Sequence, residues 1–330
     1  MTNAAAPMVD VWRGPMIESR HRGHAAVVTA GGALHAAWGA PETLIYPRSS
    51  AKMLQALPLV ESGAADAIGL GDRHLALAAA SHQGAPIHTE LASSWLAEIG
   101  RGEADLRCGI QPPRDARDRE AMRAEGRRAD QTHNNCSGKH TGFLSLETRI
   151  GGGPEYIDVD HPVQRAVCEA IADMAGEDVE TWAIDGCSAP NFATSVTGLA
   201  RAMARMAAPG SGLRGDAARQ IVAAMARYPE LVAGEKRACT ELMRAMKGVA
   251  VKTGAEGVFV AILPEQGLGV ALKIEDGATR AAEAAIAAIL VWLGVLESAH
   301  PVVQRLTYGP IRNFRDVETG AMSLADGFPA

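Results

Sequence analysis

Residues typical of β-strands lie at both ends of the chain, and a long stretch with helical periodicity separates them. The N-terminal strands span about 9–40 and the C-terminal strands about 248–275, whereas residues 48–246 are predicted to be mainly helical. The N-terminal strands alone cannot bury one face of a stable sheet. We therefore expect a single α/β (α+β) domain over residues 1–330, in which one antiparallel sheet built from both chain ends packs against helices.

Turn and helix signals refine this arrangement. Gly31-Gly32 separates two alternating runs and predicts a β-hairpin. Asp160 is a plausible cap for a helix at 162–175, where apolar residues recur on one face. The apolar run at 278–296 predicts a buried helix, because a membrane span needs about 20 apolar residues.

Composition excludes several classes of function. Hydrophobic residues make up 47% of the chain and charged residues 21%, as in ordinary globular proteins. The net charge is −6 and no basic stripe is present, so a nucleic-acid partner is not expected. The N-terminal residues lack a basic segment followed by an apolar run, so we expect a cytoplasmic protein without a membrane partner. Five scattered cysteines argue against a disulfide framework.

The first candidate for chemistry is the segment around Ser49 and Lys52, which follows Pro47 and resembles the entry to a helix. Ser49 or Ser50 can cap the first turn of that helix. Ser49 and Lys52 are three residues apart and therefore share one helical face. This Ser-x-x-Lys spacing supplies a serine nucleophile with a lysine as its base.

Two further motifs follow in an informative order. Ser81 ends a predicted helix, and Lys252-Thr253-Gly254 begins a predicted strand. Serine β-lactamases and penicillin-binding proteins carry a Ser-x-x-Lys, a second serine motif and a Lys-Thr-Gly in this order. Lys52 accepts a proton only when it is neutral, and burial near a second ammonium, Lys252, favours that form. Alternatively, Ser81 only caps its helix and Lys252 is a solvated strand residue.

The second concentration of reactive side chains lies at 133–140 and at 185–188. Spacing alone selects Cys136, Cys187 and His140 as zinc ligands, with His133 as a further candidate. The alternative is that both cysteines are buried and inert.

Five motifs together resemble the rhizobial-type, or class 3, L-asparaginases of the asparaginase II family. The resemblance runs from about Val9 to the last predicted helix. The motifs are Arg48-Ser49-Ser50-Ala51-Lys52, Ala80-Ser81-His82-Gln83-Gly84, Asn134-Asn135-Cys136-Ser137-Gly138-Lys139-His140-Thr141-Gly142, Asp185-Gly186-Cys187-Ser188 and Lys252-Thr253-Gly254-Ala255-Glu256-Gly257.

This resemblance implies a serine β-lactamase/glutaminase-like fold, a homodimer and hydrolysis of the small molecule L-asparagine to L-aspartate and ammonia. It also implies two Ser–Lys tandems, which are Ser49 with Lys52 and Ser81 with Lys252 in this sequence.

The resemblance further implies a zinc ion, Zn(2+), held by Cys136, Lys139 and Cys187, so Lys139 replaces His140 in the ligand set suggested by spacing. A ligating lysine is neutral, so zinc binding is expected to weaken at low pH. Asp185 is placed to hydrogen-bond to one of the zinc ligands without binding the metal itself. Four neighbours are expected to hold the head groups of the amino acid, namely Arg48, His82, Asn135 and Glu256.

Two other classes of function stay open at this point. One is a glutaminase or a penicillin-recognising serine hydrolase that uses the same serine chemistry. The other is a non-catalytic metal-binding module. Asparagine and glutamine differ by one methylene group in the side chain, and discrimination on that basis is worth about 1–3 kcal/mol. The order of residues does not determine which of the two substrates the site prefers.

Overall fold

The computed structural model describes residues 4–330, and the chain divides into two compact units. The sheet unit contains the N-terminal segment up to Ser50, Thr194–Ala208, and the chain from Glu241 onward. The helical unit contains Ala51–Ala193 and Pro209–Thr240. The segment Thr194–Ala208 thus belongs with the strands, although it lies within the range that we expected to form the helical insert.

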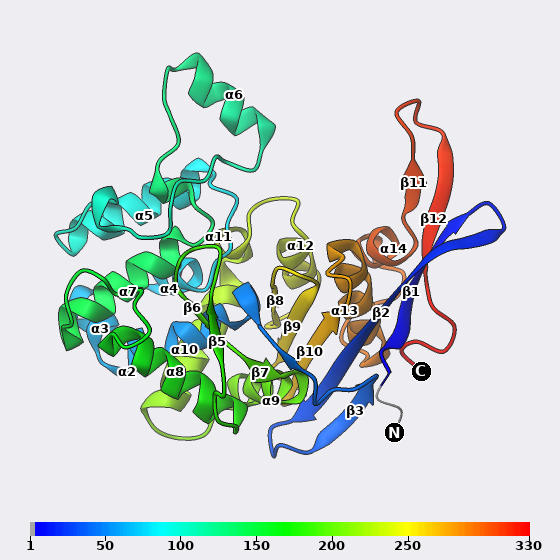
Figure 1. Cartoon of the computed structure of the whole chain (residues 1–330), viewed down its shortest axis with the longest axis horizontal. Coiled ribbons are helices and arrows are strands. Elements are labelled where there is room, and N and C mark those ends of the chain that lie inside the picture. Colours follow the sequence, from blue (N-terminus) through cyan, green and yellow to red (C-terminus); the bar gives the residue numbers. More distant parts are fainter. Residues whose placement is uncertain (1–3) are drawn as a thin grey trace. The chain divides into compact units, whose positions relative to one another are not determined.

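The sheet unit is built around an eight-stranded sheet in which every pairing is antiparallel. The order is β11-β12-β1-β2-β10-β9-β8, with β3 beside β2, and Figure 1 shows β1, β2 and β10 running together. The strands are β1 (Ala6–Arg13), β2 (Met16–Thr29), β3 (Leu34–Trp38), β8 (Ala250–Thr253), β9 (Val258–Leu263), β10 (Leu268–Ile274), β11 (Pro310–Arg312) and β12 (Glu318–Leu324). The predicted α+β class, with one antiparallel sheet from both chain ends, is confirmed.

The hairpin predicted at Gly31-Gly32 is also confirmed, because β2 pairs with β3 across that turn. Gly32 has a φ of 84°, a conformation that glycine adopts without steric cost. On its other edge β2 pairs with β10, with Val27 opposite Val270. This pairing joins the two ends of the chain in one sheet.

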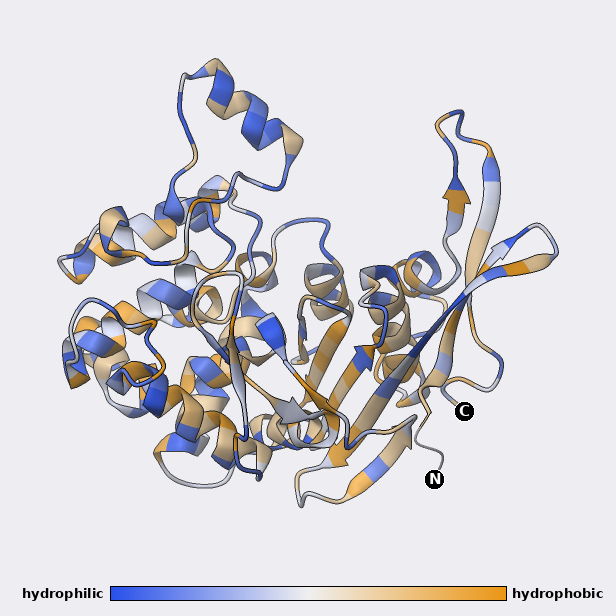
Figure 2. Cartoon of the chain, in the orientation of Figure 1, coloured by the Kyte–Doolittle hydropathy of each residue, from blue (hydrophilic) through white to orange (hydrophobic). Residues whose placement is uncertain are grey.

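Helices cover the central strands. Every residue of β9 is buried, as expected for a strand covered on both faces, and Figure 2 shows β9 and β10 as largely hydrophobic. α9 (Val196–Ala207) and α13 (Thr279–Trp292) both pack against β9 and β10. The remaining elements of this unit are β4 (Leu44–Ile45), the 3-10 helix η1 (Arg48–Ala51), β7 (Thr194–Ser195) and α14 (Pro301–Tyr308).

The helical unit is composed mainly of short helices around α7 and α8. Its elements are α1 (Lys52–Gln55), α2 (Leu57–Glu61), α3 (Ala64–Ile68), α4 (Asp72–Ala78), α5 (Pro86–Glu98), η2 (Glu103–Asp105), α6 (Ala116–Ala124), η3 (Gln131–His133), α7 (Ser137–Ile150), α8 (Pro162–Ala175), β5 (Trp182–Ile184), β6 (Pro190–Phe192), α10 (Leu213–Arg227) and α11 (Pro229–Val232). One more helix, α12 (Ala238–Ala245), contains the border at Thr240 between the units.

The predicted cap of α8 is wrong by one residue. His161, rather than Asp160, occupies the N-cap, and its Nδ1 accepts a hydrogen bond from Val163 N at 3.1 Å. Pro162 then fits the first helical position, where a missing N–H leaves nothing unpaired.

The C-terminal hairpin was not predicted from the sequence. β12 pairs with both β11 and β1, with Val9 opposite Leu324, so β1 is not an edge strand. Most residues of β12 are only partly buried, so the sequence of this strand shows only a weak hydrophobic pattern.

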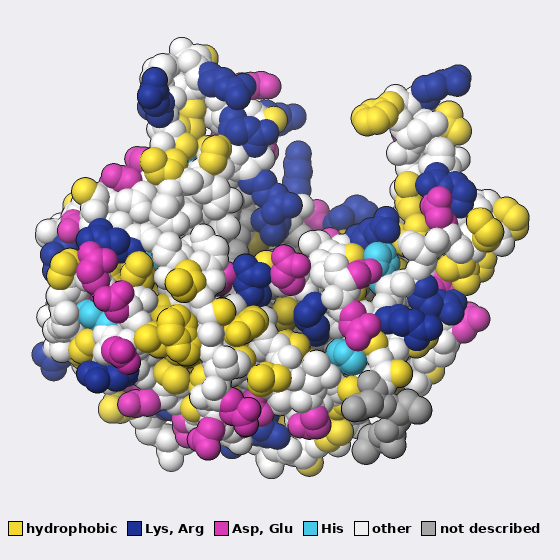
Figure 3. All heavy atoms as spheres, viewed as in Figure 1, with side chains coloured by type: hydrophobic (Ala, Val, Ile, Leu, Met, Phe, Trp, Pro, Cys, Tyr) yellow, Lys and Arg dark blue, Asp and Glu magenta, His cyan; other side chains and the backbone are white. Residues whose placement is uncertain are grey.

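Side chains of both charges lie on the surface. Figure 3 shows basic side chains gathered over α6 at the top of the view and side chains of both charges mixed below it. Within residues 4–330, the helices are too short or too polar for any of them to traverse a bilayer.

Gly269 on β10 permits the close packing of α9 on the sheet. A Cβ atom at this position would overlap Ala204 N and Ala200 O, two backbone atoms of α9. Because backbone cannot move aside as a flexible side chain does, any larger residue must push the helix away from the strand.

We therefore expect Gly269→Ala to lower the free energy of unfolding by about 1–3 kcal/mol, measured by urea denaturation. Gly31→Ala is the matched control, because its nearest contact is Thr29 Oγ1 at 3.9 Å. The control is expected to change stability by less than about 0.5 kcal/mol. Equal stability of the two variants would contradict this role of Gly269.

Candidate functional site

The residues predicted to carry the chemistry fall into two groups, one in each unit. The sheet unit contains Arg48, Ser49, Lys252 and Glu256. The helical unit contains Lys52, Ser81, His82, Asn135, Cys136, Lys139, Asp185 and Cys187. The border between the units falls between Ser50 and Ala51, one residue before Lys52.

The segment that carries Ser49 is a 3-10 turn rather than the first turn of a capped α-helix. η1 leads into α1, whose N-cap is Ala51 and makes no side-chain capping bond. Ser50 Oγ instead donates a hydrogen bond to Pro47 O at 2.7 Å. The predicted cap by Ser49 or Ser50 is therefore wrong, because the chain enters α1 through a tighter turn that uses Ser50.

The Lys-Thr-Gly strand lies directly against this turn. A Cβ atom on Gly254 would lie 2.7 Å from Pro47 O and 3.3 Å from Ser50 N. Only glycine permits so close an approach of two backbone segments. The end of β8 therefore borders the turn that contains Ser49.

Lys252, the first residue of that motif, is completely buried. Its Nζ donates to Thr253 O at 2.9 Å. A buried ammonium needs acceptors to offset its desolvation, so this contact to the strand backbone helps to hold the charge.

A cavity of about 440 Å³ lies beside the same turn, within the range typical of small-molecule sites. Arg48 and Glu256, two predicted substrate ligands of opposite charge, both line it. Both have a positive φ, 55° and 58°, which is unusual for residues other than glycine. The other lining residues are His24, Thr43, Leu44, Ile45, Tyr46, Lys273 and Glu275.

Lys273 fixes the loop that carries Glu256, a role that the sequence did not reveal. Its Nζ donates to Glu256 O at 2.8 Å and also to Ile274 O. Burial lowers the pKa of Lys273, although Glu256 opposes that shift. His24 also lines the cavity, with Nε2 3.5 Å from Glu275 Oε1.

In the helical unit, Lys52 is 1% exposed and its ammonium lies among several acceptors. Nζ donates to Ala80 O at 2.5 Å and to Ser81 Oγ at 3.0 Å. It also donates to Asn135 O at 3.4 Å and to Cys136 Sγ at 3.1 Å. Lys52 therefore joins the second serine motif to the Asn135–Cys136 segment.

His82 connects the same two segments through its ring. Nδ1 accepts from Gly84 N at 3.1 Å, so Nε2 carries the proton and donates to Ser137 Oγ at 2.9 Å. Ser137 Oγ in turn donates to Thr132 O at 2.8 Å. The ring also stacks on His88, with centroids 4.7 Å apart. Both ring nitrogens of His82 thus hold protein groups in place.

The thiol–amine cluster consists of Cys136, Lys139 and Cys187. Cys136 is the N-cap residue of α7 and Lys139 lies in its first turn, while Cys187 lies in the turn between β5 and β6. Lys139 Nζ donates to Cys187 Sγ at 3.1 Å, and it lies close enough to Cys136 to interact with that thiol electrostatically. The Cys136 thiol itself donates to Asn135 Oδ1 at 2.8 Å. The sequence motifs thus bring the three residues together.

Asp185 holds the turn that presents Cys187. Its carboxylate accepts from Gly186 N at 2.7 Å, and its carbonyl accepts from Ser188 N at 2.9 Å. Ser188 has a φ of 70°, so this tight turn is completed by a residue in the left-handed region.

Charges within the cluster are strongly coupled. The interaction with Cys136 lowers the pKa of Cys187 well below its ordinary value, and the interaction with Cys187 raises the pKa of Cys136 well above it. Burial lowers the pKa of Lys139, but the negative charge of Cys187 outweighs it, so the net shift is upward. The cluster therefore favours one thiolate, on Cys187, paired with an ammonium.

The donor types fit a zinc ion, since two thiols and an amine converge in a buried place. Within residues 4–330, no three His, Cys, Asp or Glu side chains form a group that could hold a metal, so the set depends on Lys139. His133 Nδ1 instead contacts Asp130 at 2.9 Å. His140 Nδ1 contacts Tyr156 Oη at 2.9 Å, and its ring lies close enough to Cys187 to help lower the pKa of that thiol, so His140 also borders the cluster.

Cys108 also lies near this cluster, although no motif in the sequence singles it out. This thiol is buried, and burial raises its pKa to about 12. It lies close enough to Cys187 and Lys139 to interact with them electrostatically. No local spacing signals this proximity, because Cys108 is far from both along the chain.

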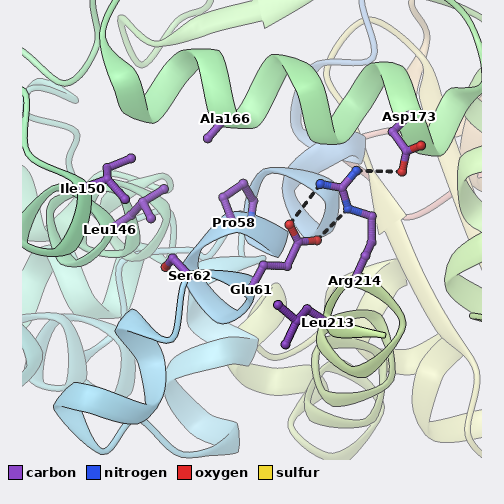
Figure 4. A pocket seen from close by; sticks show the side chains of 9 residues that line it. All are labelled: Pro58, Glu61, Ser62, Leu146, Ile150, Ala166, Asp173, Leu213 and Arg214. Carbon is purple, nitrogen blue, oxygen red and sulfur yellow. Dashed lines mark hydrogen bonds and ion pairs between the residues drawn. The ribbon is translucent and has the colours of Figure 1, made fainter. Parts of the chain in front are cut away.

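A second hollow, drawn in Figure 4, contains none of the predicted residues. Its one basic group, Arg214, is satisfied by Glu61 at 2.7 Å and Asp173 at 2.7 Å. We assign no chemistry to it.

Asp130 positions the predicted ligand segment by capping η3. Its side chain accepts from Thr132 N at 2.9 Å and contacts His133 Nδ1. Partial burial raises the pKa of Asp130, but the hydrogen bonds from Thr132 and His133 outweigh it, so the pKa lies below its ordinary value.

We expect Asp130→Ala to lower the free energy of unfolding by about 1 kcal/mol at neutral pH. Because the folded-state pKa is depressed, this contribution is present above the unfolded value of about 3.9 and is lost as the pH falls through the folded value. Urea titrations at several pH values measure it. Asp130→Asn, which keeps the acceptor without the charge, serves as control; a pH-independent loss in the alanine variant would contradict the assignment.

A known protein family and several solved structures are similar to this chain. A family model described as L-asparaginase II matches residues 9–324. No curated protein matches the chain. A β-lactamase from Mycobacterium bovis is 14% identical, with 83% of this chain and 95% of that chain covered and a TM-score of 0.46. Mglu in its native form is 15% identical, with coverage of 85% and 66% and a TM-score of 0.49, so the chain spans about two thirds of Mglu.

The family match covers nearly the whole chain and includes all five motifs from which the resemblance was inferred. It confirms that resemblance. The chain belongs to the L-asparaginase II family.

Proposed function

We propose that this protein hydrolyses L-asparagine to L-aspartate and ammonia. Membership of the family supports an amidohydrolase. The observation that carries the proposal is the contact of Gly254 with the Pro47–Ser50 turn, beside the cavity lined by Arg48 and Glu256. This arrangement supports a serine nucleophile next to a small site that carries both signs of charge.

In the proposed reaction Ser49 Oγ attacks the side-chain amide carbon while Lys52 accepts the hydroxyl proton. The C–N bond then breaks, and ammonia leaves with a proton delivered by the second tandem, Ser81 and Lys252. Water hydrolyses the aspartyl ester and restores the serine. Backbone N–H groups near the end of β8 would stabilise the oxyanion.

The cavity of the sheet unit would recognise the amino-acid head groups. Arg48 can pair with the α-carboxylate, and Glu256 can pair with the α-ammonium. Contacts from His82 and Asn135 to the substrate stay predictions. Since both ring nitrogens of His82 hold protein groups, its proposed contribution is to position Ser137 and Gly84.

Cys136, Lys139 and Cys187 would hold a zinc ion. When bound, zinc supplies positive charge next to the polar groups around Lys52. In every step above, residues of the chain bind the substrate, orient it and transfer the protons. A homodimer and a cytoplasmic location stay predictions.

Ser49→Ala is expected to reduce ammonia release from L-asparagine at least about a thousandfold, because it removes the nucleophile. Ser93→Ala, at an exposed position of α5, is the matched control and should retain wild-type activity. Release is compared for L-asparagine and L-glutamine, and nitrocefin hydrolysis is measured in parallel. Faster turnover of glutamine or nitrocefin would overturn the substrate, and an active Ser49→Ala variant would overturn the nucleophile.

Cys136→Ala is expected to lower bound zinc at least about tenfold, since it removes one of two sulfur donors. Elemental analysis after dialysis measures the metal. Cys168→Ala, a half-buried cysteine of α8, is the control and should bind as much zinc as the wild type. Equal zinc in all three proteins would exclude this ligand set.

A further inference from the structure

We propose that the cavity lined by Arg48 and Glu256 accepts asparagine derivatives that carry an apolar group on the side-chain amide nitrogen. Hydrolysis then releases that group as a primary amine. The substrate class is the secondary amides of the aspartate side chain, and L-asparagine is the simplest relative of that class. This assignment rests on the proposed function, because the same serine and the same partners of the head groups are used.

The cavity is larger than an unsubstituted amino acid requires. Its volume is about 440 Å³, which falls in the range of sites that enclose drug-sized ligands. L-Asparagine is a much smaller molecule than such a ligand, and the methylene group is the only apolar part of its side chain. Room for a further substituent therefore remains when the amino acid is bound.

An apolar wall forms one part of the cavity lining. Leu44 and Tyr46 both line the cavity and are 48% and 39% exposed, whereas Ile45 between them is buried. This alternation is typical of an extended segment, in which every second side chain lies on the same face. Leu44 and Tyr46 therefore present aliphatic and aromatic surface to the cavity, which a zwitterionic amino acid leaves largely uncovered.

The backbone around this wall is held by the sheet unit itself. β4 pairs with β7, with Leu44 opposite Ser195. Just before β4, Thr43 Oγ1 donates to Ala40 O at 2.7 Å, and Ala40 N donates to Nδ1 of His24 at 3.0 Å. A surface that is already ordered loses little conformational freedom when a ligand covers it, so contact with the wall adds to affinity.

The wall also precedes the proposed nucleophile directly in the chain. Tyr46 leads into the Pro47–Ser50 turn, which contains Ser49. The reacting amide of a bound substrate has to lie at Ser49. A substituent on that amide therefore has the apolar wall within reach.

The charges of the cavity decide where the substituent is attached. In the proposed function Arg48 pairs with the α-carboxylate and Glu256 pairs with the α-ammonium. Converting the carboxylate into an amide, or acylating the amine, removes the charge with which one of these residues pairs. The side-chain amide nitrogen carries no charge, so a substituent there leaves both ion pairs intact.

The reaction is the proposed one with a different leaving group. Ser49 Oγ attacks the amide carbon, the C–N bond breaks, and the nitrogen takes up a proton and leaves as a primary amine in place of ammonia. Water then hydrolyses the aspartyl ester and restores the serine. One water is consumed and one L-aspartate is formed with either leaving group, so no further reactant is needed.

The experiment compares the side-chain benzylamide of L-aspartate with the side-chain methylamide, using the full-length protein. Both substrates release an alkylamine, so they differ mainly in the aromatic ring that the wall would cover. Amine release is measured by chromatography over a range of substrate concentrations. We expect kcat/KM to be at least about tenfold higher for the benzylamide, because its ring is buried against apolar surface.

Variants of the wall test which residues make this contact. Tyr46→Ala and Leu44→Ala are each expected to lower the ratio of kcat/KM for the benzylamide to kcat/KM for the methylamide at least about fivefold. Tyr308→Ala is the matched control, because this tyrosine is exposed on α14 and does not line the cavity. It should keep the wild-type ratio. Circular dichroism checks that the variants fold, and the comparison in the wild type needs no variant.

Two further substrates separate the alternatives. The dipeptide L-asparaginyl-L-phenylalanine carries its apolar group on the α-carboxyl, and a higher kcat/KM for its deamidation than for the benzylamide would overturn the proposed attachment point. Hydrolysis of L-asparagine without a preference for the benzylamide over the methylamide, or wall variants that keep the preference, would overturn this inference and leave the proposed function standing. Failure to hydrolyse any of these substrates would overturn both.

Discussion

The buried amino group of Lys52 makes the contacts on which the helical unit's candidate site depends. Its acceptors come from the segment after α4 and from the segment before α7. A polar group at 1% exposure is costly to bury without partners, and these acceptors supply them. The position of Ser81 and the position of Cys136 are therefore fixed by the same group. The lysine that we propose as the base thus also organises the residues that surround it.

Close backbone approach, permitted by glycine, is the second constraint. At Gly138 a Cβ atom would overlap Leu77 O, so this glycine allows α7 to lie against α4. Its neighbour Lys139 then reaches Cys187 from the same turn of the helix. Gly254 plays the same part in the sheet unit against the Pro47–Ser50 turn. In both motifs a glycine within two positions of the functional lysine is needed for packing. The packing residue and the functional residue therefore occur together in one short run of sequence.

Local patterns determined what the sequence could predict. The Gly31-Gly32 hairpin, the two strands β9 and β10, and the one-turn separation of Cys136 and Lys139 all follow from spacing within a short segment. Contacts between distant segments do not. The pairing of β12 with β1, the packing of α9 on the sheet through Gly269 and the proximity of Cys108 to Cys187 depend on tertiary structure alone. The contact of Lys52 with Ser81 also crosses 29 residues, and neither residue type predicts it.

Backbone strain is concentrated at these same places. Within residues 4–330, five residues other than glycine have a positive φ, and three of them are Arg48, Ser188 and Glu256. Such conformations cost about 1–3 kcal/mol each, so surrounding contacts must hold them. Lys273 holds Glu256 by donating a hydrogen bond to the Glu256 carbonyl. The Asp185 carbonyl holds Ser188 by accepting a hydrogen bond from the Ser188 N–H. Arg48 and Glu256 are strained, opposite in charge and on one cavity, so the fold holds in place both residues that we propose as partners of the head groups. In such a preordered site, less of the binding free energy is lost to the ordering of its own side chains. This favours a small ligand, which makes few contacts.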